Sequence, residues 1–263
     1  MLKQRIITAI IAIIVLGVVL FVLPVNAARV FIAVVVLVAA WEWGGFLGTT
    51  NTSRILCVAV IAALQLLLYL VIETGLLAPL DVFRVALVWW VAALVWLFFY
   101  PTAVPRLFAW LAAMLVLLPA WLALDYICVA SRPMLLFMLI IVWAADIGAY
   151  FAGKQFGRVK LAPRVSPGKT WEGVVGGLLL VLVISFAGTK VFALRPEVFL
   201  PFALSVAMLS IVGDLTVSAF KRSVDMKDSG TLFPGHGGLL DRIDSVTAAA
   251  PLFALGMAAV GLA

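Results

Sequence analysis

The sequence predicts an all-α, polytopic integral membrane protein with about nine transmembrane helices. Two observations carry this prediction: 66% of the 263 residues are hydrophobic and only 11% are charged, and the mean hydropathy is +1.27. An ordinary soluble domain is roughly half apolar and about a quarter charged. The composition therefore excludes a water-soluble globular protein. It also excludes a disordered chain, because disorder requires low hydrophobicity.

Nine apolar runs have the length of a membrane helix, since about 20 apolar residues cross a bilayer core of about 30 Å. The expected spans are approximately residues 6–23, 29–47, 55–72, 82–100, 107–127, 134–153, 173–194, 198–215 and 239–262. The first run follows Lys3 and Arg5, so a signal peptide is the alternative. An uncleaved helix is favoured because the run exceeds a normal signal-peptide core and further spans follow.

The distribution of Lys and Arg predicts the orientation. With the N-terminus in the cytoplasm, 13 of the 18 basic residues fall on the cytoplasmic side, where such residues are in excess. This topology accounts for the net charge of +6 without a nucleic-acid partner. We therefore expect a multi-pass membrane protein whose N-terminus lies in the cytoplasm. Cys57 and Cys128 lack disulfide-framework or metal-ligand spacing, and both are expected to be buried.

Two predicted cytoplasmic loops, residues 154–172 and 214–244, hold 15 of the 30 charged residues of the chain. The remaining loops are short and nearly featureless. We therefore divide the chain into residues 1–132, with about five membrane helices, and residues 133–263, a catalytic membrane region that contains both charged loops.

Acidic side chains in the second loop have helical spacing. If the helix continues past Asp214, then Asp214, Ser218 and Asp225 share one face with the intervening basic pair. Asp241 and Asp244, three residues apart, share a face at the start of the last membrane helix. This places Asp214 at a helix C-terminus and the other two near a helix N-terminus, on either side of a Gly-rich turn.

Asp146 interrupts the sixth apolar run, where a carboxylate costs about 2.5 to 3.5 kcal/mol and usually faces an aqueous cavity or a partner. Clustered carboxylates repel one another, and a divalent cation relieves that repulsion. Oxygen ligands together with a phosphate substrate are typical of Mg²⁺, and whether a second cation joins it stays open. The alternative is that Asp241 and Asp244 form structural ion pairs with Lys221, Arg222 or Arg242.

The first loop carries a net charge of +4 beside this acidic region, which suits a phosphate-rich substrate. Lys169 follows Gly168 as in a Walker A motif, but Pro163 stands where that motif requires glycine. Attraction of the loop to anionic lipid headgroups is the alternative. His236 lies in the Gly-rich turn, where it could contact substrate or hold the turn.

Residues 218–244 resemble the signature of the phosphatidate cytidylyltransferases, also called CDP-diacylglycerol synthases. The matching positions are Ser218, Phe220, Lys221, Arg222, Lys227, Asp228, His236, Gly237, Gly238, Asp241, Arg242 and Asp244. The segment from Ser166 to Glu172 also resembles a family motif, and the first five spans match only as generic membrane helices.

The resemblance implies that CTP and phosphatidate are converted to CDP-diacylglycerol and pyrophosphate with Mg²⁺ by a membrane-bound homodimer. It implies Asp214 and Asp241 as metal ligands and an active site at the cytoplasmic face of the membrane, which we expect to be a bacterial inner membrane. From the residues themselves we expect Asp146 or Asp244 as a further ligand or a supporting residue. The expected catalytic residues are Lys221, Arg222, His236 and Arg242. The expected substrate-binding residues are Ser166, Lys169, Ser218, Lys227 and Asp228.

Two other functions fit less well. A secondary transporter of an anionic metabolite also has many spans and intramembrane charge, but transporters usually show two paired halves, whereas here the polarity is confined to the second half. A CDP-alcohol phosphotransferase would require an Asp-Gly-x-x-Ala-Arg motif, which this sequence lacks.

Overall fold

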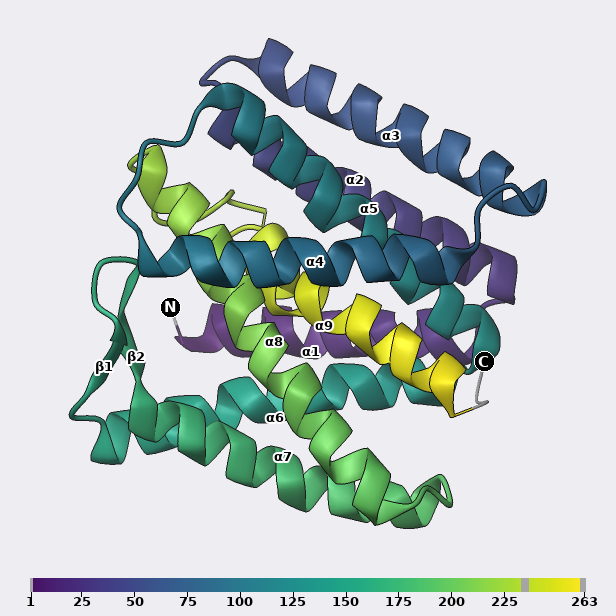
Figure 1. Ribbon diagram of the computed structural model, residues 1–263, viewed down its shortest axis with the longest axis vertical. Helices are drawn as coiled ribbons and strands as arrows, with labels where there is room; N and C mark the ends of the chain where they lie inside the picture. The colour runs from purple at the N-terminus through teal and green to yellow at the C-terminus, as the bar shows by residue number, and fades with distance from the viewer. Residues whose placement is uncertain (1, 233–236, 261–263) are drawn as a thin grey trace.

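The computed structural model describes residues 2–232 and 237–260, which are almost entirely helical. The helices are α1 (Leu2–Phe21), α2 (Val25–Leu47), α3 (Asn51–Glu73), α4 (Pro79–Phe98), α5 (Arg106–Ala130), α6 (Arg132–Phe156), α7 (Trp171–Val191), α8 (Pro196–Ser223) and α9 (Leu240–Ala259). One antiparallel hairpin, β1 (Lys160–Ala162) and β2 (Ser166–Thr170), separates α6 from α7 (Figure 1). The helical fold class is confirmed, with this hairpin as the exception.

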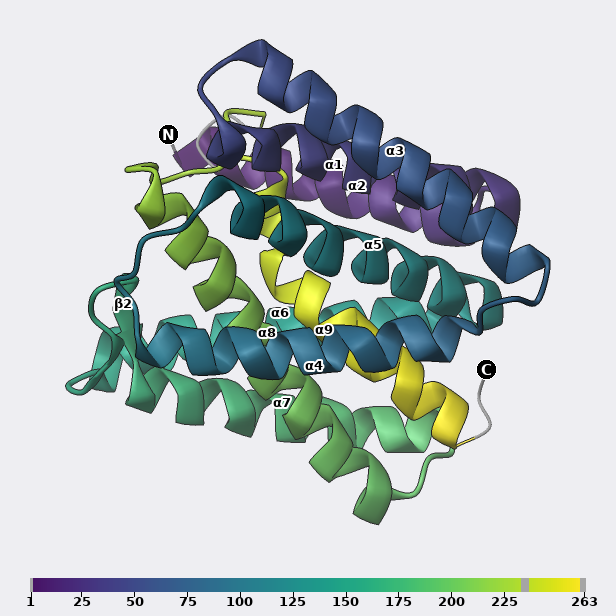
Figure 2. The same ribbon diagram turned by 45° about the horizontal axis from the view of Figure 1, so that its top comes forward.

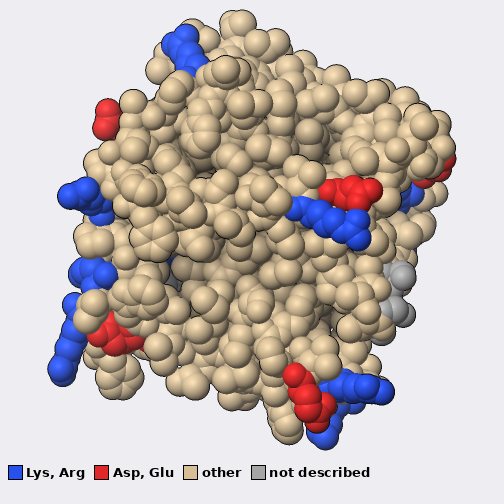
Figure 3. Space-filling model, viewed as in Figure 1, with Lys and Arg blue, Asp and Glu red and all other residues tan. Residues whose placement is uncertain are grey.

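Seven of the described helices, α2 to α8, are long and apolar enough to cross a membrane. In α1 the apolar part is the shorter segment Ile10–Phe21, and α9 is outside the seven. Figure 3 shows a face that is mostly uncharged, with its Lys, Arg, Asp and Glu side chains gathered mainly toward two opposite ends. The multi-span class is confirmed, whereas the count of nine spans and the cytoplasmic N-terminus stay predictions.

Two boundaries in the charged region differ from the sequence prediction. The expected span 198–215 ends one residue after Asp214, but α8 continues to Ser223, so Asp214 lies inside a helix rather than at its C-terminus. The expected loop 154–172 contains the end of α6 and the hairpin. The helix continues because Leu215 and Ala219 are buried against Val165 of the hairpin, which sequence periodicity alone does not reveal.

Small residues bring α6 and α7 into close contact. A Cβ on Gly177 would lie 2.6 Å from the carbonyl oxygen of Ala145, and one on Gly176 would overlap the side chain of Ala152. Such small-residue contacts let the backbones of membrane helices approach each other. The hydroxyl of Thr170 accepts a hydrogen bond of 3.1 Å from the Gly173 amide and caps α7. The close pairing fixes the hairpin at one end of the two helices.

The N-terminal helices pack directly on the C-terminal ones, as Figures 1 and 2 show for α4 and α5 against α8 and α9. The contact is centred on Phe220, a signature residue in α8 that is fully buried. Its ring centroid lies 5.1 Å from Trp43, 5.1 Å from Trp96 and 5.8 Å from Phe108. Aromatic pairs at these separations contribute about 0.5–1.5 kcal/mol each beyond their burial. The first region of the chain therefore helps to position α8.

Candidate functional site

The candidate site lies at the end of the bundle where the hairpin, the end of α8 and the start of α9 lie near one another (Figure 1). Two lysine–carboxylate pairs connect these elements. Lys169 of β2 lies 2.6 Å from Asp214 Oδ2 in α8. Lys221 of α8 lies 2.7 Å from Asp241 Oδ1 in α9. Both charged loops predicted from the sequence therefore contribute to one site.

One face of α8 carries the predicted polar residues. The hydroxyl of Ser218 donates a hydrogen bond of 3.1 Å to Asp214 Oδ1, which confirms that these residues share a face. Lys221 continues that face, and its side chain is 9% exposed. Asp225 does not belong to it, because the helix ends at Ser223 and Asp225 has a positive φ of 57°. The helical extension to Asp225 is thus wrong, since the chain turns away to begin the loop.

Two acidic residues from two other helices interact electrostatically with Asp214 of α8. Asp146 of α6 interacts electrostatically with Asp214, Lys169 and Arg242. Asp244 of α9 is buried and also interacts electrostatically with Asp214. Asp146 is exposed although it lies in an apolar helix, where a carboxylate usually faces an aqueous cavity or a partner. The structure thus gathers Asp146 and Asp244 around Asp214.

Asp241 has a different environment. Its Oδ1 pairs with Lys221, and its Oδ2 accepts hydrogen bonds of 2.9 Å from the backbone amides of Ser229 and Gly238. The ion-pair alternative is therefore correct for the geometry of Asp241. The carboxylate holds the loop between α8 and α9 and neutralises a buried lysine at the same time.

The oxygen donors around Asp214 have the chemistry that a hard cation such as Mg²⁺ prefers. Across residues 2–232 and 237–260, no three His, Cys, Asp or Glu side chains converge closely enough to hold a metal by themselves. Mg²⁺ is typically bound by one or two carboxylates together with substrate phosphates and water. The residues present therefore fit a cation site that substrate phosphates complete.

The remaining predicted residues that the structure describes lie at the same end of the bundle or in the loop between α8 and α9. Arg222 donates hydrogen bonds to main-chain carbonyls, at 3.4 Å to Val165 and 3.0 Å to Met226, and so ties the hairpin to the loop. Ser166 lies in β2. The other described members are exposed: Lys227 and Asp228 in the loop and Arg242 in the first turn of α9. His236 lies outside the described residues.

Sequence reasoning missed Glu42, a buried carboxylate near the end of α2. It accepts hydrogen bonds from the Ser229 hydroxyl and from the amides of Leu239 and Leu240. A signal was present, because Glu42 is the one charged residue in the apolar run 30–53. A charged residue within such a run is a functional-site candidate by default.

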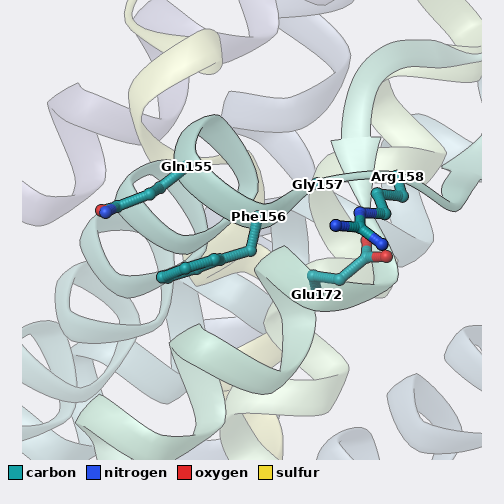
Figure 4. A pocket seen from close by; sticks show the side chains of 5 residues that line it. All are labelled: Gln155, Phe156, Gly157, Arg158 and Glu172. Atoms are coloured by element: carbon teal, nitrogen blue, oxygen red, sulfur yellow. The ribbon is translucent and has the colours of Figure 1, made fainter.

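A pocket of about 450 Å³ opens beside the hairpin, lined by Gln155, Phe156, Gly157, Arg158 and Glu172. Figure 4 shows Arg158 and Glu172 side by side, with Gln155 directed away from them. The Glu172 carboxylate accepts hydrogen bonds of 3.1 and 3.3 Å from the Val159 amide. None of the predicted site residues lines this pocket, so we place it at the outer edge of the hairpin and outside the candidate site.

Comparison with known proteins matches residues 3–260 to the cytidylyltransferase family. The chain is 44% identical over 272 residues to a phosphatidate cytidylyltransferase of Pseudomonas aeruginosa, covering 99% of this chain and 98% of that protein. It is 37% identical over 280 residues to the protein of the same name from Haemophilus influenzae, covering 96% and 97% of the two chains. The similarity to the Thermotoga maritima protein of that name, 44% over 126 residues, covers 44% of this chain and 46% of that one.

Proposed function

Since the chain belongs to the cytidylyltransferase family, we propose that it forms CDP-diacylglycerol and pyrophosphate from CTP and phosphatidate. The observation that carries the proposal is the match over nearly the whole length of two relatives named for this activity. The paired lysines and carboxylates at one end of the bundle supply the chemistry that such a transfer needs. The family match gives no support to the transporter alternative.

In the proposed reaction, a phosphate oxygen of phosphatidate attacks the α-phosphorus of CTP. A new P–O bond forms, the bond between the α-phosphorus and the bridging oxygen to the β-phosphate breaks, and pyrophosphate leaves with that oxygen. The attacking group is already an anion, so a strong general base is not required. Positioning and neutralisation of charge therefore provide most of the rate.

The proposed roles of the lysines follow from their positions. Lys169 and Lys221 come from two different elements and now pair with Asp214 and Asp241. Ammonium groups held at this end would bind the triphosphate and the lipid phosphate. Arg222 holds the loop beside them through its contacts with backbone carbonyls. The substrate phosphates then replace carboxylates as partners of the lysines.

We further propose that Asp214 helps to hold Mg²⁺, with Asp146, Asp241 or Asp244 as further ligand or support. When bound, Mg²⁺ supplies positive charge to the phosphate oxygens. The lysine partner of Asp214 is itself 26% exposed, so the pair can open without unfolding the helix. The oxygen character of Asp214 and Ser218 supports this assignment.

The cellular setting is part of the proposal. The lipid tails of phosphatidate stay in the bilayer, so its headgroup must reach the site near a membrane boundary. We propose that the protein lies in the bacterial inner membrane with the candidate site on the cytoplasmic side, where CTP is available. The excess of Lys and Arg predicted for that side supports the orientation. The homodimer stays a prediction.

The decisive experiment follows two labels of CTP with purified protein, phosphatidate and Mg²⁺. Label in the α-phosphate should enter the lipid phase, and label in the γ-phosphate should appear in pyrophosphate in equal amount. Replacing phosphatidate with diacylglycerol should stop both. Transfer of γ-label to lipid, or the absence of any lipid label with folded protein, would refute the proposal.

A further inference from the structure

Glu42 joins the N-terminal helices to the loop that leads into α9. Its side chain comes from α2, and the residue is 3% exposed. Glu42 Oε2 accepts hydrogen bonds of 2.8 Å from the Ser229 hydroxyl and 2.7 Å from the Leu240 amide, and Oε1 accepts one of 2.9 Å from the Leu239 amide. A buried carboxylate with three donors is held in one position.

This carboxylate takes the place of a local cap for α9. The first amides of a helix lack partners within the helix, and the helix dipole favours negative charge there. Leu239, the residue before α9, provides no side-chain cap. Glu42 therefore supplies from another helix what the local sequence lacks. Glu42 thereby contacts the two residues at which α9 starts, immediately before Asp241.

Glu42 and Asp241 hold the same loop. Asp241 binds the amides of Ser229 and Gly238, whereas Glu42 binds the hydroxyl of Ser229 and the two amides that follow Gly238. Both carboxylates thus bind Ser229. Of the three consecutive amides 238–240, Asp241 binds the first and Glu42 binds the other two. Asp241 in turn pairs with Lys221. A continuous chain of polar contacts runs from α2 to the lysine that we place at the substrate phosphates.

The loop passes so close to Glu42 that two of its positions have no room for a side chain. A Cβ on Gly230 would lie 2.5 Å from Glu42 Oε1, and a Cβ on Gly238 would overlap Glu42 Oε2 and the Ser229 hydroxyl. Gly238 belongs to the signature described above. The close approach to Glu42 gives a physical reason for glycine at this position.

From these contacts we infer that Glu42 is a positioning residue for cytidylyl transfer, which orients Asp241 and Lys221 by fixing Ser229 and the start of α9. The inference rests on the proposed function. It assigns the N-terminal helices a part in the site, beyond that of generic membrane spans. Loss of residues that orient a reactive or metal-binding group typically lowers activity about 10- to 100-fold.

The test compares Glu42→Gln with wild type for turnover and for the KM of phosphatidate, using equal amounts of folded protein well below the melting temperature. Glutamine keeps the shape, but its carboxamide loses the charge and brings one N–H group toward backbone donors. We expect kcat to fall about 10- to 100-fold while the KM of phosphatidate changes less than threefold. An unchanged kcat with an active wild type would overturn the inference alone. An inactive wild type would overturn the proposed function and the inference with it.

A double-mutant cycle separates positioning from simple loss of stability. Ser229→Ala removes the hydroxyl that Glu42 binds and leaves the Ser229 amide to Asp241. If both act through the loop, Ser229→Ala should lower kcat severalfold on its own, and the double variant should be no worse than Glu42→Gln. Losses that multiply would contradict the inference. If Glu42→Gln does not fold, Ser229→Ala alone decides, and a wild-type kcat for it would overturn the inference.

Asp125→Asn is the matched control. Asp125 of α5 is also a buried carboxylate. It is held by Arg29, which lies in α2 at the opposite end of that helix from Glu42. This change should lower thermal stability and leave kcat and KM at wild-type values. Equal losses of kcat in Asp125→Asn and Glu42→Gln would show a general effect of buried charge and would overturn the inference.

Discussion

The two ends of helix α2 hold buried carboxylates in different ways. Glu42 near one end binds a loop and the start of another helix, whereas Arg29 near the other end forms a bidentate pair with Asp125, at 2.8 and 3.0 Å. The two α2 positions are about 20 Å apart along the helix at 1.5 Å per residue. The Arg29 guanidinium joins a single hydrogen-bonded carboxylate, with two bonds to the same group.

The end of the helix bundle that holds the candidate site, called here the Asp214 end, is built differently. It gathers several carboxylates and pairs two of them with lysines from other elements. Asp146 and Asp244 each interact with Asp214 there, and Lys169 and Asp214 are each about a quarter exposed. A single ion pair stabilises a fold, whereas a cluster of several carboxylates and lysines can exchange its partners for phosphates and a cation. The comparison teaches that clustering of several carboxylates and lysines from different elements, rather than burial of charge, distinguishes the candidate site.

The largest expected effect is that of Asp241→Asn. The side chains of Lys221 and Asp241 are only 9% and 8% exposed, and removing one partner from a buried pair typically costs about 3–5 kcal/mol. We expect activity to fall below detection and the melting temperature of the detergent-solubilised protein to drop. Thermal unfolding and formation of CDP-diacylglycerol measure the two effects. Normal turnover would remove Asp241 from the site.

Asp125→Asn should cost less. Arg29 is partly exposed, with 31% of its side chain accessible, so it can be solvated when its partner is lost. Losing charge-assisted hydrogen bonds of this kind costs about 1–3 kcal/mol. Thermal unfolding should show the loss while the specific activity of the folded protein stays unchanged. A drop in specific activity would mean that the two ends are not independent.

Lys169→Ala should act on binding more than on folding. The Lys169–Asp214 pair is partly exposed, and such pairs contribute about 0–1 kcal/mol to stability. Loss of one phosphate-binding ammonium should raise the KM for CTP about tenfold, which corresponds to about 1.4 kcal/mol. Initial rates over a range of CTP concentrations measure the change. A KM equal to that of wild type would exclude Lys169 from the nucleotide site.

The smallest effect is expected for Arg84→Ala. Arg84 pairs with Asp81 one turn earlier in α4, and both side chains are largely exposed, at 66% and 50%. An exposed pair of this spacing contributes about 0.3–0.5 kcal/mol. Neither turnover nor melting temperature should change measurably. A large loss of activity would show that the chemistry is not confined to the Asp214 end.

Much of the fold could be predicted because membrane helices leave a simple pattern. Each described helix overlaps one of the nine apolar runs, and the spacing of Asp214 and Ser218 correctly places them on one face. The extension of α8 to Ser223 could not be read from apolar length, because it depends on burial of Leu215 and Ala219 against Val165. The hairpin was missed because β1 has only three residues, which is too short to produce a recognisable strand pattern.

The site was predicted in part. The resemblance and the charge distribution located Lys169, Lys221 and Asp241, but they did not reveal that Asp241 also binds two backbone amides of the loop. The lone charge of Glu42 in an apolar run could have marked it as a candidate, but the loop that it binds lies about 190 residues away in sequence, so its partners could not be predicted. A contact between distant segments leaves no local pattern.

The most direct test of this account is the ratio of the rates at which Asp214→Asn and Asp125→Asn form CDP-diacylglycerol, measured side by side with equal amounts of folded protein. In the proposal Asp214 holds the cation that neutralises the phosphates, and loss of one group that stabilises transition-state charge typically costs about 10²- to 10³-fold in rate. We predict that Asp214→Asn loses at least that much while Asp125→Asn keeps the wild-type rate. Similar rates for the two variants, whether both high or both low, would contradict the assignment of the active site to the Asp214 end.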